Sequence, residues 1–335
     1  MIRARAPLRL GLAGGGTDLS PYCEVYDGAI LNVTIDRHAY AFIGPPNDGK
    51  TSFSALDIGT EAVFDPEEAM SAKATLILHE GVYTRIVREF LGGVPAPLSI
   101  RTPVDAPAGS GLGSSSALVV ALVEAFRAQY ALPLGRYEIA HLAWDIERND
   151  LGLMGGRQDQ YAAAFGGVNF IEFLPNDRVI DNPLRLVPGA IEEIELLHWP
   201  VAKFARYYCD ERRVRIQFRR DQAMRELKAD ADEVKRAFVN GDIRRMANVL
   251  QNSWNAKRKS AHGISNTVID EFHAIATRHG ALAGKISGAS GGGFMMFFVR
   301  PQDRQRLIVG LRAAGGNADS VAFTHRGTVT WTATV

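Results

Sequence analysis

The chain has 335 residues, of which 46% are hydrophobic and 22% are charged, and its formal net charge is +1. This composition is typical of a globular protein of two domains, and the charge gives no electrostatic basis for a nucleic-acid or membrane-surface partner. The N-terminal residues lack the apolar core of a signal peptide, and no apolar run is long enough to span a bilayer. Two cysteines are too few for a disulfide framework or a structural zinc site, so we expect a reduced, cytoplasmic protein.

Strands and helices alternate in the first half of the chain. Alternating or β-branched residues predict strands at residues 8–12, 29–35, 39–43, 97–102 and 168–173. Apolar residues at helical spacing predict helices at residues 75–91, 115–130 and 137–149, and a short one from residue 158. Residues 44–72 are expected to be mostly loop.

The composition changes near residues 174–190, where prolines, glycine, asparagine and aspartate cluster and predict a domain boundary. Beyond it we expect helices at residues 214–239, 242–260, 265–279 and 302–313, and strands at residues 285–287, 294–299 and 319–334. The pattern predicts an α/β (α+β) protein with two domains, residues 1–185 and residues 186–335.

A glycine- and serine-rich run, PAGSGLGSSSA, occupies residues 107–117 directly ahead of an apolar helix. Glycines at alternate positions let N–H groups approach a ligand, and the serines that follow can cap the helix, whose N-terminus favours an anion. The run is not a Rossmann fingerprint, which would need glycine at Ser114, and no Gly-Lys-Ser/Thr follows to make a Walker A loop. We therefore expect a polyphosphate cradle; a loop that only turns the chain into the helix is the alternative.

Three further segments carry candidate site residues. Arg9 precedes a glycine turn that ends at Asp18, whose carboxylate could accept hydrogen bonds from hydroxyls or cap a helix. Glu147 and Asp159 flank a glycine hinge that could bring one carboxylate to Mg²⁺ and the other to the nucleophile, although each alone would be expected at the surface. Three glycines at residues 291–293 are costly to order ahead of a strand, which favours a functional loop over a hairpin.

Together, and in this order, these segments resemble the GHMP kinases, which phosphorylate galactose, homoserine, mevalonate and phosphomevalonate. The resemblance covers nearly the whole chain, and the Pro-x-Gly-x-Gly-Leu-Gly-Ser-Ser pattern at residues 107–115 is its most specific part. Within the family, residues 6–18, 28–37 and 155–161 resemble the heptose-phosphate kinase branch. Kinases acting on fucose share a related glycine–aspartate entry.

The resemblance implies an ATP- and Mg²⁺-dependent kinase with a ribosomal-protein-like N-terminal domain, a ferredoxin-like C-terminal domain and an active site between them. The implied ATP-binding residues are Pro107, Gly109, Ser110, Gly111, Leu112, Gly113, Ser114, Ser115 and Ser116. The implied metal ligands are Ser114, Ser115 and Glu147. Asp159 would take the proton of the attacking hydroxyl, and Arg9 would hold Asp159 ionised and offset the developing charge.

The implied reaction is phosphorylation of the anomeric C1 hydroxyl of a heptose 7-phosphate to the 1,7-bisphosphate, for nucleotide-activated heptose and surface polysaccharide. The implied sugar contacts are Gly15, Gly16, Thr17, Asp18, Gly156, Gly291 and Gly292. Lys257, Arg258 and Lys259 are candidates for the distal phosphate, and an exposed basic helix face is the alternative. A C1 kinase of a free sugar such as fucose, and a non-catalytic sugar and ATP sensor, are the competing functions. The expected partners are small molecules, for a monomer or homodimer.

Two segments depart from the family pattern. Ser290 stands where glycine is usual, and we expect only a small loop adjustment there. After residue 197 the chain reads HWPVAKFARYYC and stays basic to Arg220, where the family has an aromatic-Thr-Gly turn and an Arg-bearing helix. No family contact is therefore assigned to residues 198–213.

Overall fold

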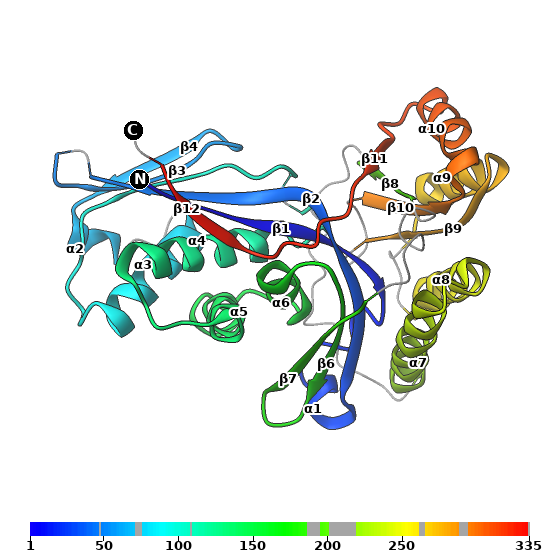
Figure 1. Cartoon of the computed structure of the whole chain (residues 1–335), viewed down its shortest axis with the longest axis horizontal. Coiled ribbons are helices and arrows are strands. Elements are labelled where there is room, and N and C mark those ends of the chain that lie inside the picture. Colours follow the sequence, from blue (N-terminus) through cyan, green and yellow to red (C-terminus); the bar gives the residue numbers. More distant parts are fainter. Residues whose placement is uncertain are drawn as a thin grey trace.

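The computed structural model describes residues 1–46, 48–70, 76–107, 109–185, 195–200, 219–260, 265–287 and 294–333. Within these ranges the strands form two sheets, one of eight strands and one of four. Figure 1 shows the larger sheet with helices along one face, and the smaller sheet beside α9 and α10 at the other end of the molecule. Two α/β units confirm the predicted fold class.

The larger sheet is built on two long strands, β1 (Ile2–Ala13) and β2 (Gly28–Gly44). Among the described residues its order is β12–β1–β2–β5–β3–β4, and β6 and then β7 continue from the other end of β2. Because Gly28–Val33 pair with β6 while Phe42–Gly44 pair with β5, one strand serves two parts of the sheet. The strands predicted at 29–35 and 39–43 are therefore one continuous strand.

The helices on this sheet are α1 (Tyr22–Tyr26), α2 (Pro66–Ala69), α3 (Ile77–Phe90), α4 (Ser114–Tyr130), α5 (Arg136–Asp145) and α6 (Gln158–Phe165). A π-helical turn, η1 (Ile146–Asp150), follows α5 directly. Helix α4 packs against β1 and β2 and is buried along most of its length, as its apolar composition predicts. The start of α4 is thereby fixed at the edge of the site described below.

One prediction about this half was wrong. Residues 44–72 contain the hairpin β3 (Thr51–Ala55) and β4 (Thr60–Phe64), because β3 pairs in parallel with β5 (Ser99–Thr102) and buries Phe53. Pairing of β3 with a strand distant in the sequence decides this case, and local composition does not report it. The segment predicted to hold the domain boundary begins with β7 (Arg178–Pro183), which forms a hairpin with β6 (Val168–Leu174) in the same sheet.

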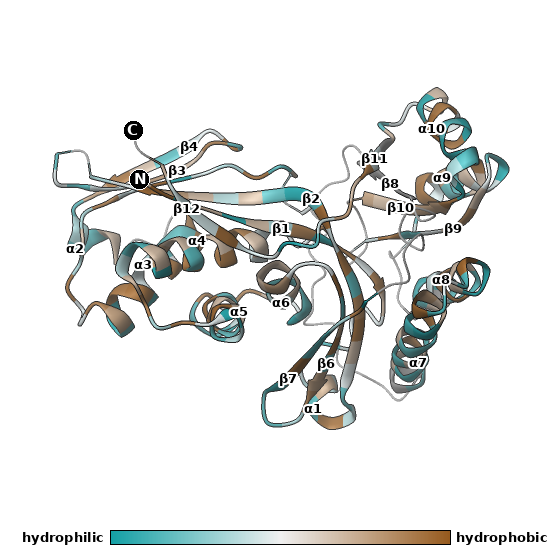
Figure 2. Ribbon diagram, in the orientation of Figure 1, coloured by the Kyte–Doolittle hydropathy of each residue, from teal (hydrophilic) through white to brown (hydrophobic). Residues whose placement is uncertain are grey.

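The smaller sheet has the order β11 (Asp319–Val321), β8 (Glu195–Pro200), β10 (Phe294–Val299) and β9 (Ala281–Ile286) within the described ranges. Helices α8 (Ile243–Ser260) and α9 (Thr267–Arg278) pack against β9, and α10 (Arg304–Ala313), preceded by the short turn η3 (Pro301–Asp303), packs against α9. Helix α7 (Arg219–Val239) packs against α8 and against β1 and β2 of the larger sheet. Strand β10 is buried on both faces, with Met295 and Phe297 in one apolar cluster and Met296 and Phe298 in the other. In Figure 2 the polar residues of α7 and α8 stand out against the brown of the sheet strands.

The last strand, β12 (Val329–Thr332), returns to the larger sheet and pairs with β1. The single strand predicted at 319–334 is therefore two strands in different sheets, and the chain termini lie near one another (Figure 1). The domain limits at residues 185 and 186 stay a prediction, because residues 186–194 are outside the described ranges.

Candidate active site

The glycine-rich loop adopts the conformation that its glycines allow. Gly109, Gly111 and Gly113 have φ values of +78°, +75° and +73°, in the left-handed region that other residues disfavour. Helix α4 begins at Ser114, and its N-cap is Gly113 with no side-chain cap among the described residues, so the prediction of a serine cap was wrong. The first N–H groups of α4 therefore suit an anion.

The loop is fastened at both sides. The N–H of Arg9 on β1 donates to the carbonyl of Leu112 at 2.9 Å, and the N–H of Phe294 on β10 donates to the carbonyl of Ser110 at 3.0 Å. The N–H of Ser110 closes the start of the loop on the carbonyl of Pro107 at 3.1 Å. The predicted cradle is thus held between the two sheets.

Arg9 and Asp159 form the centre of the site. Nε of Arg9 donates to Oδ1 of Asp159 at 2.7 Å, and Nη2 lies 2.6 Å from the same oxygen. Nη1 of Arg9 donates to the carbonyl of Gly111 at 2.7 Å, and only 5% of Arg9 is exposed. A methyl group at Gly113 would lie 3.3 Å from Oδ2 of Asp159, so the second carboxylate oxygen borders the cradle. The structure brings together β1, the cradle and α6, as the sequence predicts.

Asp18 positions the helix that carries Asp159. Its Oδ2 accepts hydrogen bonds from the N–H groups of Arg157 at 2.9 Å and Gln158 at 3.1 Å, at the start of α6. Burial raises the pKa of Asp18 above its ordinary value, and these backbone donors act in the opposite direction. A methyl group at Gly156 would lie 1.9 Å from Oδ2, so glycine is required there. These contacts make Asp18 a cap at the start of α6, and its contact with sugar hydroxyls stays a prediction.

The glycine turn before Asp18 is an ordered unit. The Thr17 hydroxyl donates to the carbonyl of Gly14 at 2.8 Å and accepts from the N–H of Ala29 at 3.1 Å, and Thr17 is fully buried. A methyl group at Gly15 would meet open space, whereas one at Gly16 would lie 3.6 Å from Cε of Met224 on α7. The sugar contacts assigned to Gly15 and Gly16 stay a prediction.

Glu147 lies on the π-helical turn and is 1% exposed. Its Oε2 accepts from Nε2 of Gln160, which also donates to the Ser116 hydroxyl at 3.0 Å. Burial raises the pKa of Glu147, while Arg148, Ser116 and Gln160 lower it. Gln160 was missed in the sequence, although it directly follows Asp159 in a segment already singled out.

This group fits a magnesium ion that is also bound by phosphate oxygens. The described residues contain no set of three or more His, Cys, Asp or Glu side chains that could hold a metal alone. Mg²⁺ usually takes one or two carboxylates and completes its shell with water and substrate phosphates. Glu147, the Ser116 hydroxyl and Oε1 of Gln160 supply oxygens beside the cradle, and this Oε1 is buried with no hydrogen-bond donor in the described part of the chain. Ser114 is buried at the start of α4 and Ser115 is exposed.

The smaller sheet and the residue that follows β9 add to the site Lys285 and Ser287, which were not among the site residues predicted from the sequence. The Ser287 hydroxyl donates to the carbonyl of Gly111 at 3.1 Å and lies 3.4 Å from Nη1 of Arg9. Nζ of Lys285 donates to the carbonyl of Leu12 at 2.8 Å, and burial lowers the pKa of Lys285 well below its ordinary value. Both residues flank the glycine run, which was the available signal. Gly291 and Gly292 lie outside the described residues.

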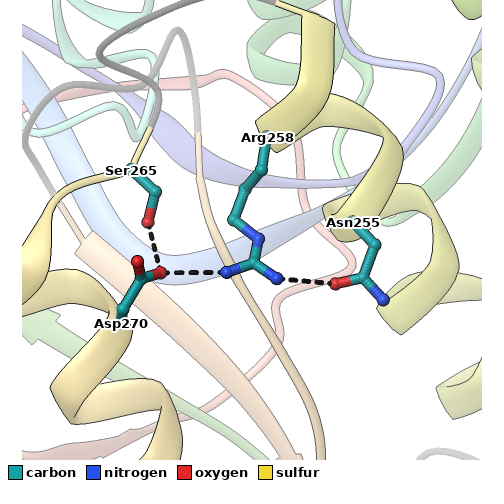
Figure 3. A pocket seen from close by; sticks show the side chains of 4 residues that line it. All are labelled: Asn255, Arg258, Ser265 and Asp270. Atoms are coloured by element: carbon teal, nitrogen blue, oxygen red, sulfur yellow. Dashed lines mark hydrogen bonds and ion pairs between the residues drawn. The ribbon is translucent and has the colours of Figure 1, made fainter.

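Two of the predicted distal-phosphate cations face different surroundings. Arg258 lies in a pocket of about 460 Å³ (Figure 3), where it forms an ion pair with Asp270 at 3.0 Å and donates to Oδ1 of Asn255 at 3.0 Å. The Ser265 hydroxyl donates to the same Asp270 at 2.7 Å. Lys257, one residue earlier on α8, instead acts electrostatically on the buried Lys285.

Strand β8 covers part of the segment that departs from the family pattern. Its residues pair with β10 and β11, so the chain enters this segment as an internal strand of the smaller sheet. Residues 201–213 lie outside the described ranges.

Comparison with known proteins identifies the family. Residues 78–167 match the GHMP kinase N-terminal domain, and residues 234–317 match the GHMP kinase C-terminal domain. The chain is 40% identical to D-glycero-alpha-D-manno-heptose 7-phosphate kinase of Campylobacter jejuni, over 98% of each chain. A crystal structure of a D-glycero-D-manno-heptose 1-phosphate kinase from Bacteroides thetaiotaomicron, 38% identical, covers 100% of both chains with a TM-score of 0.83.

More distant relatives share the fold. Lactococcus lactis galactokinase complexed with galactose is 18% identical, and its structure matches 98% of this chain and 95% of its own with a TM-score of 0.78. Among the described residues, no helix is both long and apolar enough to cross a membrane. The two domain matches and the relatives at 38% and 40% identity show that this chain belongs to the GHMP kinase family and is a phosphotransferase with an alcohol group as acceptor.

Proposed function

We propose that this kinase uses Mg-ATP to phosphorylate the anomeric C1 hydroxyl of D-glycero-D-manno-heptose 7-phosphate, giving the 1,7-bisphosphate. The observation that carries the proposal is the convergence on Arg9 of the cradle, through Gly111, and of α6, through Asp159. The names of the relatives at 38% and 40% identity both specify a heptose phosphate, although they differ in the position of its phosphate.

The nucleotide would bind with its phosphates in the cradle. The left-handed glycines would let the loop curl around the phosphates, and the start of α4 adds the positive end of the helix dipole. Glu147 and Ser116 would hold Mg²⁺ against the phosphate oxygens, where the ion neutralises their charge when bound. Phosphoryl transfer needs mainly positioning and charge neutralisation, and these residues supply both.

Asp159 would act on the sugar hydroxyl with its second carboxylate oxygen. Arg9 holds Oδ1, so Oδ2 is left to receive the proton of the C1 hydroxyl as its oxygen attacks the γ-phosphorus. A bond forms between this oxygen and phosphorus, and the bond from phosphorus to the bridging oxygen of ADP breaks, so that ADP leaves with that electron pair. Arg9 also donates to the carbonyl of Gly111 in the cradle, so its positive charge lies beside both Asp159 and the cradle. There it would offset the negative charge that develops between the sugar hydroxyl and ATP.

Lys257 would bind the distal phosphate of the sugar. Lys257 acts electrostatically on Lys285, whose Nζ donates to the carbonyl of Leu12 on β1, beside the glycine turn. A kinase of a free sugar would need no cation for this phosphate. A non-catalytic sensor would need no Arg9–Asp159 ion pair aligned with the cradle, and this pair favours catalysis.

The test is ADP release with Mg-ATP and a panel of acceptors: heptose 7-phosphate, heptose 1-phosphate, free heptose, mannose, fucose and galactose. We expect turnover with heptose 7-phosphate alone. Turnover of a free sugar would show that the enzyme is a free-sugar kinase. ATP binding without turnover of any acceptor would favour the non-catalytic sensor. Lys257→Met should raise KM for heptose 7-phosphate, whereas Arg258→Met, its matched control, should leave KM unchanged.

A further inference from the structure

The proposed metal ligand Glu147 does not lie on a regular α-helix. The sequence predicts one helix over residues 137–149, but α5 ends at Asp145 and the chain continues as the π-helical turn Ile146–Asp150. The N–H of Leu151 donates to the carbonyl of Ile146 at 3.0 Å, five residues earlier. Such turns are rare and occur frequently at functional sites.

Arg85 on α3 forms hydrogen bonds to residues at both ends of the π-helical turn. Its Nη1 donates to Asp150 at 2.8 Å, and its Nη2 donates to Asp145, the residue immediately before the turn. The side chains of Arg85, Asp145 and Asp150 are 22%, 20% and 32% exposed, so the group is partly shielded from water. One guanidinium therefore fixes the separation between the residues that bracket Glu147.

Helix α3 also approaches the turn closely one helical turn before Arg85. Gly81 lies against Leu151, and a methyl group at Gly81 would come within 2.8 Å of Cδ1 of Leu151. Because Gly81 and Arg85 are four residues apart, they share one face of α3, and α3 contacts the turn. The backbone contact sets the distance of α3, and the guanidinium sets the position of the turn.

Arg148 connects the same turn to the start of α6. Its Nη1 donates to the carbonyl of Leu153 at 3.4 Å, and its Nη2 donates to the carbonyl of Gly156 at 3.3 Å. Gly156 directly precedes the residues that Asp18 caps. The turn is thus held by Arg85 on its outer side and joined to the Asp159 helix by Arg148.

We infer that Arg85 is a positioning residue for Glu147: by clamping Asp145 and Asp150 it holds the π-helical turn that presents the Glu147 carboxylate to the metal. The inference rests on the proposed function, which assigns Glu147 to Mg²⁺. Without the clamp, the turn is free to rewind toward an α-helix, which would change the direction of Glu147 relative to Ser116. Residues that orient a metal ligand typically affect metal affinity by about 10- to 100-fold.

If Arg85 is replaced, a purely electrostatic role and a positional role predict opposite changes in metal binding. Removal of a cation near a metal site should strengthen metal binding if Arg85 acts only through its charge. Removal of the clamp should weaken metal binding if Arg85 acts through position. Asp150→Asn removes a negative charge and also the clamp, so both mechanisms predict weaker binding for that variant. Only the positional role predicts weaker binding for both Arg85→Gln and Asp150→Asn.

The experiment measures the affinity of the full chain for the ATP analogue AMPPNP by calorimetry, once with Mn²⁺ and once with EDTA. The ratio of the two affinities gives the gain in AMPPNP affinity that is due to the metal, and the measurement requires no turnover. We expect Arg85→Gln and Asp150→Asn to reduce this gain by about tenfold, with the affinity in EDTA unchanged. Arg85→Lys, which keeps the charge and reaches one carboxylate, should recover part of the gain. Arg88→Gln, an exposed arginine on the same helix, is the matched control and should behave as wild type.

An Arg85→Gln variant with a gain equal to or greater than that of the wild type would overturn the inference. Glu147→Gln separates this result from a failure of the proposed function. If the wild type gains affinity with Mn²⁺ and Glu147→Gln loses that gain, the metal assignment holds and Arg85→Gln alone decides the clamp. If the wild type shows no gain, or Glu147→Gln keeps it, both the assignment and the clamp are wrong.

Discussion

Arg9 holds Oδ1 of Asp159 through two nitrogens, at 2.7 Å and 2.6 Å, and leaves Oδ2 beside Gly113 of the cradle. This relationship joins residues that lie 150 positions apart in the sequence. It orients one carboxylate oxygen toward the proposed phosphate site, because the other is fully used by the guanidinium.

Asp159→Asn should lower kcat by about 10²- to 10⁴-fold, because an amide cannot receive the hydroxyl proton while its oxygen can still accept from Arg9. Affinity for AMPPNP should stay near that of the wild type, since Asp159 does not hold the cradle itself. Steady-state ADP release and calorimetry measure the two quantities. A variant that kept more than about 5% of wild-type turnover would remove Asp159 from its assigned role.

Gly113→Ala should lower kcat by about 10- to 100-fold, because the added methyl group would lie 3.2 Å from Cγ of Asp159 and displace the carboxylate. Gly92→Ala is the matched control: its φ of +64° is close to the +73° of Gly113, but the methyl group would meet open space. Both substitutions carry about 1–2 kcal/mol of backbone strain, so their unfolding free energies should fall alike. Equal losses of kcat would show that strain, and not Asp159, is responsible.

Asp18 should act chiefly as the cap of α6. Asp18→Ala leaves the N–H groups of Arg157 and Gln158 without their acceptor and should lower the unfolding free energy by about 1–2 kcal/mol. Asp18→Asn keeps an acceptor oxygen, and because burial raises the pKa of Asp18, loss of the charge should be tolerated. Urea unfolding compares the two variants. If the asparagine variant is as unstable as the alanine variant, the carboxylate charge is needed and the cap is not the main role.

Asp181 should make stability depend on pH. Both of its carboxylate oxygens are buried without a partner among the described residues, and burial raises its pKa from 3.8 to about 7. Between these values the folded chain binds the proton more tightly than the unfolded chain, so this contribution to stability is lost as pH rises toward 7. Asp181→Asn should therefore raise the unfolding free energy at pH 8, by about 1–3 kcal/mol, and leave it unchanged below pH 4.

Asp177→Asn provides the contrast for that experiment. Asp177 lies in the same hairpin, but its side chain is 60% exposed and pairs with Arg157 at 2.7 Å. The substitution should cost about 1 kcal/mol or less at pH 8, because exposed ion pairs contribute little. An Asp181→Asn variant with no gain at pH 8 would show that its carboxylate is not buried as described.

The sequence predicted the features whose causes are local. Alternate glycines predicted the left-handed loop, and the apolar residues of α4 predicted a buried helix directly after it. The family pattern then linked Arg9, Glu147 and Asp159, and the structure brings Arg9 and Asp159 into contact. These features depend on short stretches of chain or on a motif that was recognised as a whole.

The features that were missed depend on distant partners. The π-helical turn depends on Arg85, and the start of α6 depends on Asp18, about 140 residues away. Strands β3 and β12 acquire their places by pairing with β5 and β1, which lie far from them along the chain. Lys257 and Arg258 are neighbours in the sequence, but helix geometry turns them toward different surroundings. None of these relationships leaves a periodic signal in the sequence.

The most direct test of the account is to identify the product formed from heptose 7-phosphate and Mg-ATP by phosphorus and proton NMR. We predict a second phosphorus signal coupled to the anomeric proton, formed in equal amount to ADP and absent with Asp159→Asn. A new phosphate on any other carbon, or the same product rate from free heptose, would contradict the proposed C1 transfer to a distally phosphorylated sugar.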